Sequence, residues 1–185
     1  MSAHLSPYRI PGLVLIEGKI FPDERGSFME SFREEDFSSL PGARFVQDNL
    51  SRSKRGVLRG LHYQKRPMAL GKLVRCVFGK IFDVAVDIRR GSPTYGHWAS
   101  LELSDDVNRA LWVPEGFAHG FCALSAEAAV QYRTNAYWSP ENERGIIWSD
   151  PALSIPWPIE NPILSPKDAE LPVLSEADNN YVWED

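Results

Sequence analysis

Short β-prone runs, separated every few residues by Pro or Gly, are the feature that most restricts how this chain can fold. The chain contains 14 Pro and 13 Gly, and the segments between them are rich in Val, Ile and Phe. Pro and Gly end strands and form turns, and short strands at regular spacing are typical of an all-β sandwich or barrel. The sequence therefore predicts an all-β fold with few and short helices.

The expected strands follow this punctuation. They cover residues 12–20, 27–31, 45–50, 57–64, 72–78, 80–88, 97–103, 109–113, 118–123, 128–134 and 146–148. Gly79 is expected to form a tight hairpin turn between two of them. Helical candidates are residues 32–40 and short segments near the C-terminus. There is no internal repeat, low-complexity segment or linker, so residues 1–185 are expected to form one domain.

Alternation inside the strands places polar, proton-active side chains among apolar ones. Successive strand residues point to opposite faces of a sheet. Lys72 shares a face with Val74, Cys76 and Phe78; His119 shares one with Phe117 and Phe121; Tyr132 shares one with Ala128, Val130 and Thr134. A barrel with an apolar lining and a few convergent polar groups is a ligand cavity. A blander interpretation is that these groups simply reach water at the barrel mouth.

A stretch of cations surrounds a single strand histidine, His62. From residue 49 to residue 82 there are nine Lys or Arg and no Asp or Glu, although the whole chain has a net charge of -5. A local excess of cations on an acidic protein favours a site for a small anion over nucleic acid. A regular strand would place Arg59 and His62 on opposite faces. Either Gly60 marks a bulge, or Arg59 serves the site of a neighbouring subunit.

Metal, redox and membrane functions have little support in the sequence. Gln64 stands where a second strand histidine would complete a metal pair, and the chain has no Cys-x-x-Cys, so neither a metal nor a cofactor is expected. Cys76 and Cys122 lie in apolar runs and are expected to be buried free thiols. The first residues lack a secretory pattern and no apolar run is long enough to span a membrane, so a cytoplasmic protein is expected.

Seven segments of the chain carry recognisable motifs. In chain order they are Arg25–Glu30, Phe45–Ser51, Gly56–Gln64, Gly71–Arg75, Phe82–Arg89, Gly116–Phe121 and Ser165–Asp168. Together they resemble the dTDP-4-dehydrorhamnose 3,5-epimerase family. The resemblance implies a double-stranded β-helix, or cupin-like jelly roll, that works as a homodimer without metal or other cofactor. It also implies a nucleotide-sugar substrate, dTDP-4-dehydro-6-deoxy-D-glucose, and epimerisation at its C3 and C5.

The resemblance also implies roles for individual residues. His62 matches the catalytic base, Asp168 the carboxylate that orients it, Lys72 the stabiliser of an enolate oxygen, and Tyr132 the acid that delivers the new proton. The positions that match substrate contacts are Arg25, Glu30, Gln47, Asn49, Arg59, His119, Glu143 and Lys167. Asp83 is expected to contact either Lys72 or His119 and hold it in position, without contacting the substrate itself. This set suits the chemistry, because inversion next to a ketone needs a base, a stabiliser of negative charge and an acid.

The chain departs from the family pattern at a few positions. Met68 and Leu70 stand where polar residues are common, and Trp138 stands where a second Tyr often follows Tyr137. These departures leave a 3- or 5-mono-epimerase of another nucleotide 4-keto sugar open as an alternative. A non-catalytic cupin that binds sugar nucleotides is a second alternative, which the paired acid and base argue against. A nucleic-acid-binding module is a third.

Overall fold

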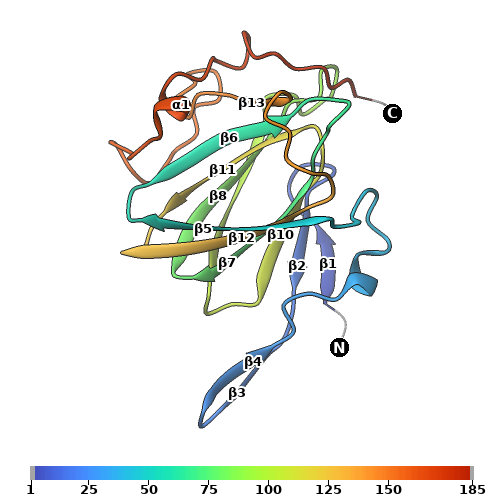
Figure 1. Ribbon diagram of the computed structural model, residues 1–185, viewed down its shortest axis with the longest axis vertical. Coiled ribbons are helices and arrows are strands. Elements are labelled where there is room, and N and C mark those ends of the chain that lie inside the picture. The colour runs from blue at the N-terminus through green and yellow to red at the C-terminus, as the bar shows by residue number, and fades with distance from the viewer. Residues whose placement is uncertain (1–2, 184–185) are drawn as a thin grey trace.

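The protein, seen as a computed structural model that describes residues 3–183, is built almost entirely of β-strands (Figure 1). The strands are β1 (His4–Pro7), β2 (Val14–Glu17), β3 (Ile20–Asp23), β4 (Gly26–Met29), β5 (Gln47–Lys54), β6 (Leu58–Gln64), β7 (Lys72–Phe78), β8 (Lys80–Asp87), β9 (Trp98–Ser104), β10 (Arg109–Val113), β11 (Phe117–Ala123), β12 (Glu127–Thr134) and β13 (Glu143–Gly145). The described helices are a 3-10 turn at Glu34–Phe37 and α1 at Pro166–Ala169. The prediction of an all-β chain with short helices is confirmed.

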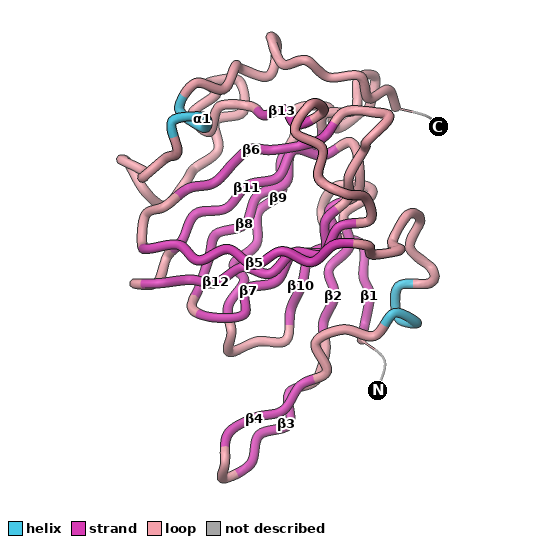
Figure 2. The backbone as a smooth tube through the Cα atoms, in the orientation of Figure 1, coloured by secondary structure: helices cyan, strands magenta, loops and turns pink. Residues whose placement is uncertain are grey.

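Two sheets face each other and form the body of a cupin-like jelly roll, as predicted (Figure 2). The six-stranded sheet has the order β1-β2-β10-β7-β12-β5, and the five-stranded sheet has the order β13-β6-β11-β8-β9. Side chains that alternate inward from both sheets, such as Val74, Val130 and Phe121, pack into one core between them. The predicted inward faces of the strands that carry Lys72, His119 and Tyr132 are therefore confirmed.

The outer face of each sheet is covered by a different part of the chain. The segment that contains the 3-10 turn lies over the six-stranded sheet, where Phe37 and Ala43 pack on Trp112. The C-terminal part covers the five-stranded sheet, where Trp157 and Tyr181 bury Val84 and its neighbours. Strand β11 is thus buried along its whole length.

Some elements predicted from the local sequence pattern are wrong. Gly79 does not form a hairpin, because β7 belongs to the six-stranded sheet and β8 to the five-stranded one. The chain crosses between the sheets there, with Gly79 at a φ of 73° and its amide donating to Asp105 at 2.8 Å. The predicted strand 146–148 is also wrong, since β13 ends at residue 145. Ile146 still exchanges two backbone hydrogen bonds with Leu61 of β6, but Ile147 already donates to Pro172 at 2.8 Å. The predicted strand 12–20 is split into β2 and the start of β3.

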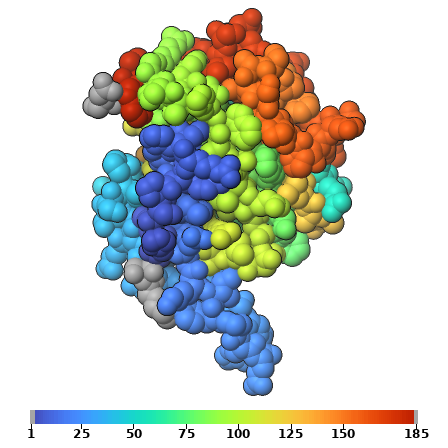
Figure 3. Space-filling view, turned by 180° about the vertical axis from the view of Figure 1, so that it is seen from behind, coloured from blue at the N-terminus to red at the C-terminus, as the bar shows by residue number. Residues whose placement is uncertain are grey.

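The hairpin β3–β4 projects from the body as an arm, and the space-filling view shows it standing clear of the rest of the molecule (Figure 3). Phe28 on this arm is 70% exposed, which is unusual for so large an apolar side chain. Arg25 lies at the turn and pairs with Asp23 at 2.6 Å. Both predicted thiols are confirmed as buried and free, at Cys76 and Cys122. Within residues 3–183, no helix has the length and apolar character needed to cross a bilayer.

Candidate active site

Two adjoining cavities of about 240 and 250 Å³ open between the sheets and form one cleft. The residues that line both cavities are His62, Lys72, Tyr132 and Glu143. The first cavity adds Gln47, Asn49, Gln64, Leu70 and Trp138, and the second adds Arg59, His119, Lys167 and Asp168. Most of the predicted site residues therefore come together, with three of the four expected catalytic residues at the junction of the two cavities.

His62 and Asp168 form a close pair in this cleft. The Nε2 atom of His62 lies 2.6 Å from Oδ1 of Asp168, and Asp168 is almost fully buried. Asp168 is held by the first turn of α1, where its amide donates to the Ser165 hydroxyl at 3.0 Å. Burial alone would raise the pKa of Asp168, but its bonds to His62 and to the Gly60 amide outweigh burial and lower it. The carboxylate is therefore ionised and holds the imidazole in one orientation.

A bulge at Gly60 explains how Arg59 and His62 reach the same cleft. His119 of β11 pairs with His62, but Phe121 pairs with Arg59, so two steps on β11 oppose three on β6. Gly60 has a φ of 126°, and a Cβ there would lie 2.6 Å from the Cα of Gly120. Only glycine meets both conditions. Of the two predicted explanations, the bulge is the one present, and Arg59 lines the second cavity of its own chain.

Lys72 and Tyr132 come from the six-stranded sheet and face the strand that carries His62. The Nζ atom of Lys72 reaches across the cleft to donate to the carbonyl oxygen of His62 at 3.3 Å. Burial lowers the pKa of Lys72 to about 8, although the charges of Glu143 and Asp83 oppose this shift. The ammonium form still dominates at pH 7. Burial, followed by the charge of Glu143, raises the pKa of Tyr132, so its phenol keeps its proton.

His119 and Asp83 form a second buried imidazole–carboxylate pair beside the first. Their Nε2 and Oδ1 atoms lie 2.8 Å apart, and Asp83 is fully buried. Burial lowers the pKa of His119 more than the charge of Asp83 raises it, so this imidazole is neutral. The structure thus decides between the two predicted partners of Asp83, since its carboxylate bonds His119. Within the described residues, the Oδ2 atom of Asp83 has no hydrogen-bond partner.

The mouth of the cleft is held by a few polar contacts. Lys167 forms a close ion pair with Glu143. Burial would raise the pKa of Glu143, but the paired Lys167 lowers it overall. Gln47 donates to Asn49 at 2.9 Å and accepts from the Trp138 amide at 3.1 Å. These contacts attach the loop that carries Trp138 to β5.

Two of the predicted substrate contacts do not lie in the cleft. Arg25 sits at the tip of the arm with its side chain 85% exposed, and Glu30 follows β4 and pairs with Arg33 at 2.6 Å. Neither residue lines either cavity. The arm stands away from the body (Figure 1), and Glu30 follows it at its base, where its backbone oxygen accepts from the Asn108 side chain at 3.3 Å. The cleft of a single chain therefore lacks these two side chains.

Sequence reasoning missed some residues of the cleft. Ser165 lines the second cavity and caps the helix that holds Asp168. Of its motif, only Lys167 and Asp168 are predicted to be site residues. Gln64 was considered only as the absence of a histidine, yet its side chain is buried in the first cavity. Its spacing of two from His62 was the available signal, because both then share a strand face. Within residues 3–183, no group of three or more His, Cys, Asp or Glu is arranged to hold a metal ion.

Comparison with known proteins decides the family. A family model described as dTDP-4-dehydrorhamnose 3,5-epimerase matches residues 7–176. The chain belongs to this family. The family resemblance predicted from the seven motifs is therefore confirmed, and with it the isomerase class. The match includes the strands of both facing sheets from β2 on, and the residues of the cleft.

Relatives in this family include double and single epimerases. A dTDP-4-dehydrorhamnose 3,5-epimerase from Shigella flexneri is 56% identical over 171 residues, which cover 91% of this chain and 94% of the relative. The crystal structure of an epimerase from Legionella pneumophila in complex with dTDP-4-keto-L-rhamnose is 49% identical, covers 94% of both chains and has a TM-score of 0.89. A 3'-monoepimerase from Streptomyces bikiniensis, solved with dTDP-quinovose, is 35% identical over 91% of this chain and 87% of its own, with a TM-score of 0.86.

Proposed function

We propose that this protein epimerises C3 and C5 of dTDP-4-dehydro-6-deoxy-D-glucose and so forms dTDP-4-dehydro-L-rhamnose. The observation that carries the proposal is the placement of His62 and Tyr132 on facing sheets of one cleft, with Lys72 on the strand next to that of Tyr132. A base and an acid on opposite sides of a sugar ring are what inversion of a carbon requires. The family and the relatives described above support the same reaction.

The proposed reaction begins at His62. Asp168 occupies Nε2 of His62, so Nδ1 is the ring nitrogen that remains to take a proton from the sugar. The C4 ketone acidifies the C–H bonds at C3 and C5, and removal of either proton leaves an enolate. Asp168 stabilises the imidazolium that forms at this step, because its carboxylate is ionised and lies at hydrogen-bond distance.

Lys72 and Tyr132 complete the proposed step. The Lys72 ammonium, in the partly buried cleft, stabilises the negative charge that develops on the C4 oxygen. Tyr132 then donates a proton to the opposite face of the carbon and recovers it from solvent. A phenol with a raised pKa is a weak acid, and it releases its proton only to a base as strong as an enolate.

The remaining cleft residues are proposed to bind the substrate. Arg59 and Lys167 bring positive charge to the second cavity, which suits a diphosphate. Gln47 and Asn49 offer amide groups to the first cavity, Glu143 lies at the junction, and neutral His119 can accept a hydrogen bond from a sugar hydroxyl. Asp83 fixes the ring of His119 from behind.

Isotope labelling tests the proposed function directly. With dTDP-4-dehydro-6-deoxy-D-glucose in deuterated water, we expect deuterium at both C3 and C5, located by NMR, and no effect of EDTA on the rate. Label at one carbon only would identify a mono-epimerase, the activity named for the Streptomyces bikiniensis relative. If no label enters with this or any other nucleotide 4-keto sugar, the protein is a binding cupin. Loss of activity that a divalent ion restores would contradict the expected independence of metal.

A homodimer is proposed to complete the cleft. The arm carries Arg25 and the exposed Phe28 away from their own body. In a monomer this leaves a large apolar side chain in contact with water. The six-stranded sheet also exposes Leu50 by 61% and Phe78 by 56%. We therefore assign Arg25 and Glu30 to the cleft of a second copy, where Arg25 adds a bidentate donor for the diphosphate.

Mixing two inactive variants tests this assignment. We expect Arg25→Ala and His62→Ala each to lose most of their activity, and a mixture refolded together to regain about a quarter of the wild-type sites. A mixed dimer then has one cleft with both replacements and one with neither. Steady-state rates measure the recovery. If Arg25 acts within its own chain, every cleft keeps one defect and the mixture stays inactive.

The cellular compartment is proposed from the cysteines. Cys76 and Cys122 are both buried and free, and burial raises the pKa of Cys76 to about 11, so neither thiol is reactive. Reducing compartments keep such thiols unpaired, whereas secreted proteins of this size often use their cysteines in disulfides. We therefore propose a cytoplasmic location.

A further inference from the structure

Gln64 is a buried polar residue of the cleft to which the proposed reaction gives no role. It is the last residue of β6, two positions after His62 and on the same face, and it is only 3% exposed. Its side chain lines the first cavity, away from Asp168 and the second cavity. A buried amide remains in a core only when its hydrogen bonds are satisfied, so its partners are informative.

The side chain of Gln64 joins two loops through their backbones. Its Nε2 donates to the carbonyl oxygen of Met68 at 2.7 Å and to that of Tyr137 at 3.2 Å. Its Oε1 accepts from the amide of Ser139 at 2.7 Å. Both protons of the amide group are therefore used inside the protein. Gln64 therefore has no donor left for a substrate, and its side chain serves first to join the two loops.

The two loops that Gln64 joins form walls of the first cavity. The loop after β6 supplies Leu70, and the loop after β12 supplies Trp138. Trp138 is 56% exposed and has little packing of its own to hold it. The separation of these two walls, and so the width of the first cavity, depends on the bridge through Gln64.

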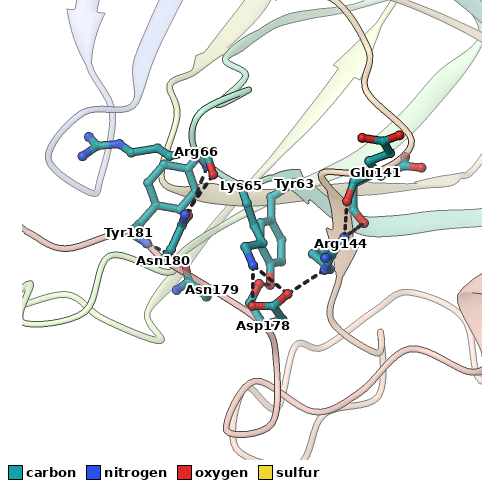
Figure 4. A network of polar contacts seen from close by, with 10 residues as sticks. Tyr63, Lys65, Arg66, Glu141, Arg144, Asp178, Asn179, Asn180 and Tyr181 are labelled. Atoms are coloured by element: carbon teal, nitrogen blue, oxygen red, sulfur yellow. Dashed lines mark hydrogen bonds and ion pairs between the residues drawn. The ribbon is translucent and has the colours of Figure 1, made fainter.

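The backbone of Gln64 is fixed from the other side by the C-terminal segment 178–181. Figure 4 shows how this segment also contacts Lys65 and Arg66, the next two residues of the chain. The hydroxyl of Tyr181 donates to the carbonyl oxygen of Gln64 at 2.5 Å. Lys65 pairs with Asp178 at 2.6 Å, and Asn180 exchanges two hydrogen bonds with the backbone of Arg66. The end of β6 is thus a firm support from which the Gln64 side chain holds the two cavity walls in place.

We infer that Gln64 is a positioning residue that sets the affinity of the cleft for its nucleotide sugar. It does so by holding the Leu70 and Trp138 walls at a fixed separation, and it takes no part in proton transfer. The inference rests on the proposed function, since it concerns the same cleft. His62, Lys72 and Tyr132 lie on strands and do not depend on these loops. Loss of the bridge therefore weakens binding while the chemical step is preserved.

Replacing Gln64 by Met tests this inference, because Met has a similar length but cannot bridge the loops. We expect KM for dTDP-4-dehydro-6-deoxy-D-glucose to rise about tenfold or more, with kcat within about threefold of wild type. The Kd for dTDP, measured by calorimetry, should rise with KM. Gln131→Met is the matched control, since Gln131 is also hydrogen-bonded, to Asp48 at 2.9 Å, but lies outside the cleft. It should leave both constants unchanged.

Gln64→Glu gives a second readout that a merely structural role would not produce. A carboxylate at this buried position would face the carbonyl oxygens of Met68 and Tyr137, so its pKa would be raised. The protonated form can donate to one carbonyl and accept from Ser139, which rebuilds most of the bridge. We therefore expect the ratio of variant KM to wild-type KM to fall as the pH is lowered from about 8 to about 6. The neighbouring ionisable groups, on His62, Lys72, Tyr63 and Glu143, are the same in both proteins, so their contributions to KM cancel in this ratio.

The outcomes separate the inference from the proposed function. A wild-type protein that neither exchanges nor epimerises the sugar contradicts the proposed function, whatever the Gln64 variants do to the binding of dTDP. An active wild type together with an unchanged KM in Gln64→Met overturns the inference alone. A fall in kcat and in thermal stability, with KM constant, would identify Gln64 as part of the fold only. A KM ratio for Gln64→Glu that does not change with pH also counts against the bridge.

Discussion

Replacing His62 by Ala should stop deuterium uptake at both C3 and C5, because one imidazole is proposed to remove both protons. A positioned general base typically contributes roughly 10²- to 10⁴-fold to a rate, and we expect a loss in this range. Exchange of each carbon is followed by NMR in deuterated water. If C3 still exchanges at the wild-type rate, another residue is its base, and His119, which pairs with His62 across the strands, is the first to test.

Two further variants define the role of His62. His4→Ala is the matched control, because His4 lies exposed on β1 at the edge of the six-stranded sheet, and it should keep full activity. Asp168→Asn should lower the exchange of both carbons while thermal unfolding shows an intact fold, since the amide cannot stabilise the imidazolium. Full activity of Asp168→Asn would mean that the 2.6 Å contact with His62 serves the fold and not the reaction.

Replacing Tyr132 by Phe should separate proton removal from inversion. The phenol is proposed to deliver a proton, so its loss should reduce the epimerised product by roughly 10²- to 10⁴-fold. His62 would still form the enolate and Lys72 would still stabilise it. His62 could then return a deuteron, taken from solvent, to the face from which the proton left. The expected signature is a high ratio of exchange to inversion, measured by NMR on the same sample.

Tyr137→Phe is the control for Tyr132→Phe. Tyr137 lies in the neighbouring loop and is 64% exposed, and it does not line either cavity, so its phenol should be dispensable. An equal fall of exchange and inversion in Tyr132→Phe would rule out Tyr132 as the proton donor. An exchange-to-inversion ratio that rises in Tyr137→Phe would instead transfer that role to Tyr137.

Strand alternation alone predicted much of the interior. The inward positions of Lys72, His119 and Tyr132 follow from a period of two, and the cavities lie where these positions meet. The pairing of strands could not be predicted in this way. The single residue between β7 and β8 is typical of a hairpin, but each strand finds its partners far along the chain, in β10 and β12 or in β9 and β11. Local turn signals carry no information about such partners.

The residues of the candidate site were likewise predictable only where the local sequence carries the information. The bulge that brings Arg59 beside His62 depends on the approach of Gly60 to Gly120 of another strand, and Gly60 was its only local sign. Asp168 was found through the family resemblance, because nothing near it in sequence points to a histidine so far away. Arg25 and Glu30 were grouped with the cleft by the same resemblance, yet the arm carries them out of it. A single sequence does not distinguish contacts within a chain from contacts between copies.

The pairing of His62 with Asp168 joins residues 106 positions apart, and α1 is held to the body by few other contacts. The two facing sheets are complete without α1, since their strands end with β12 and β13. Short segments with few contacts open locally at a smaller cost in free energy than the core does. In mild denaturant, undocking of α1 would therefore abolish catalytic activity while circular dichroism still reports an intact barrel. Catalysis is for this reason a more sensitive measure of complete folding than strand content.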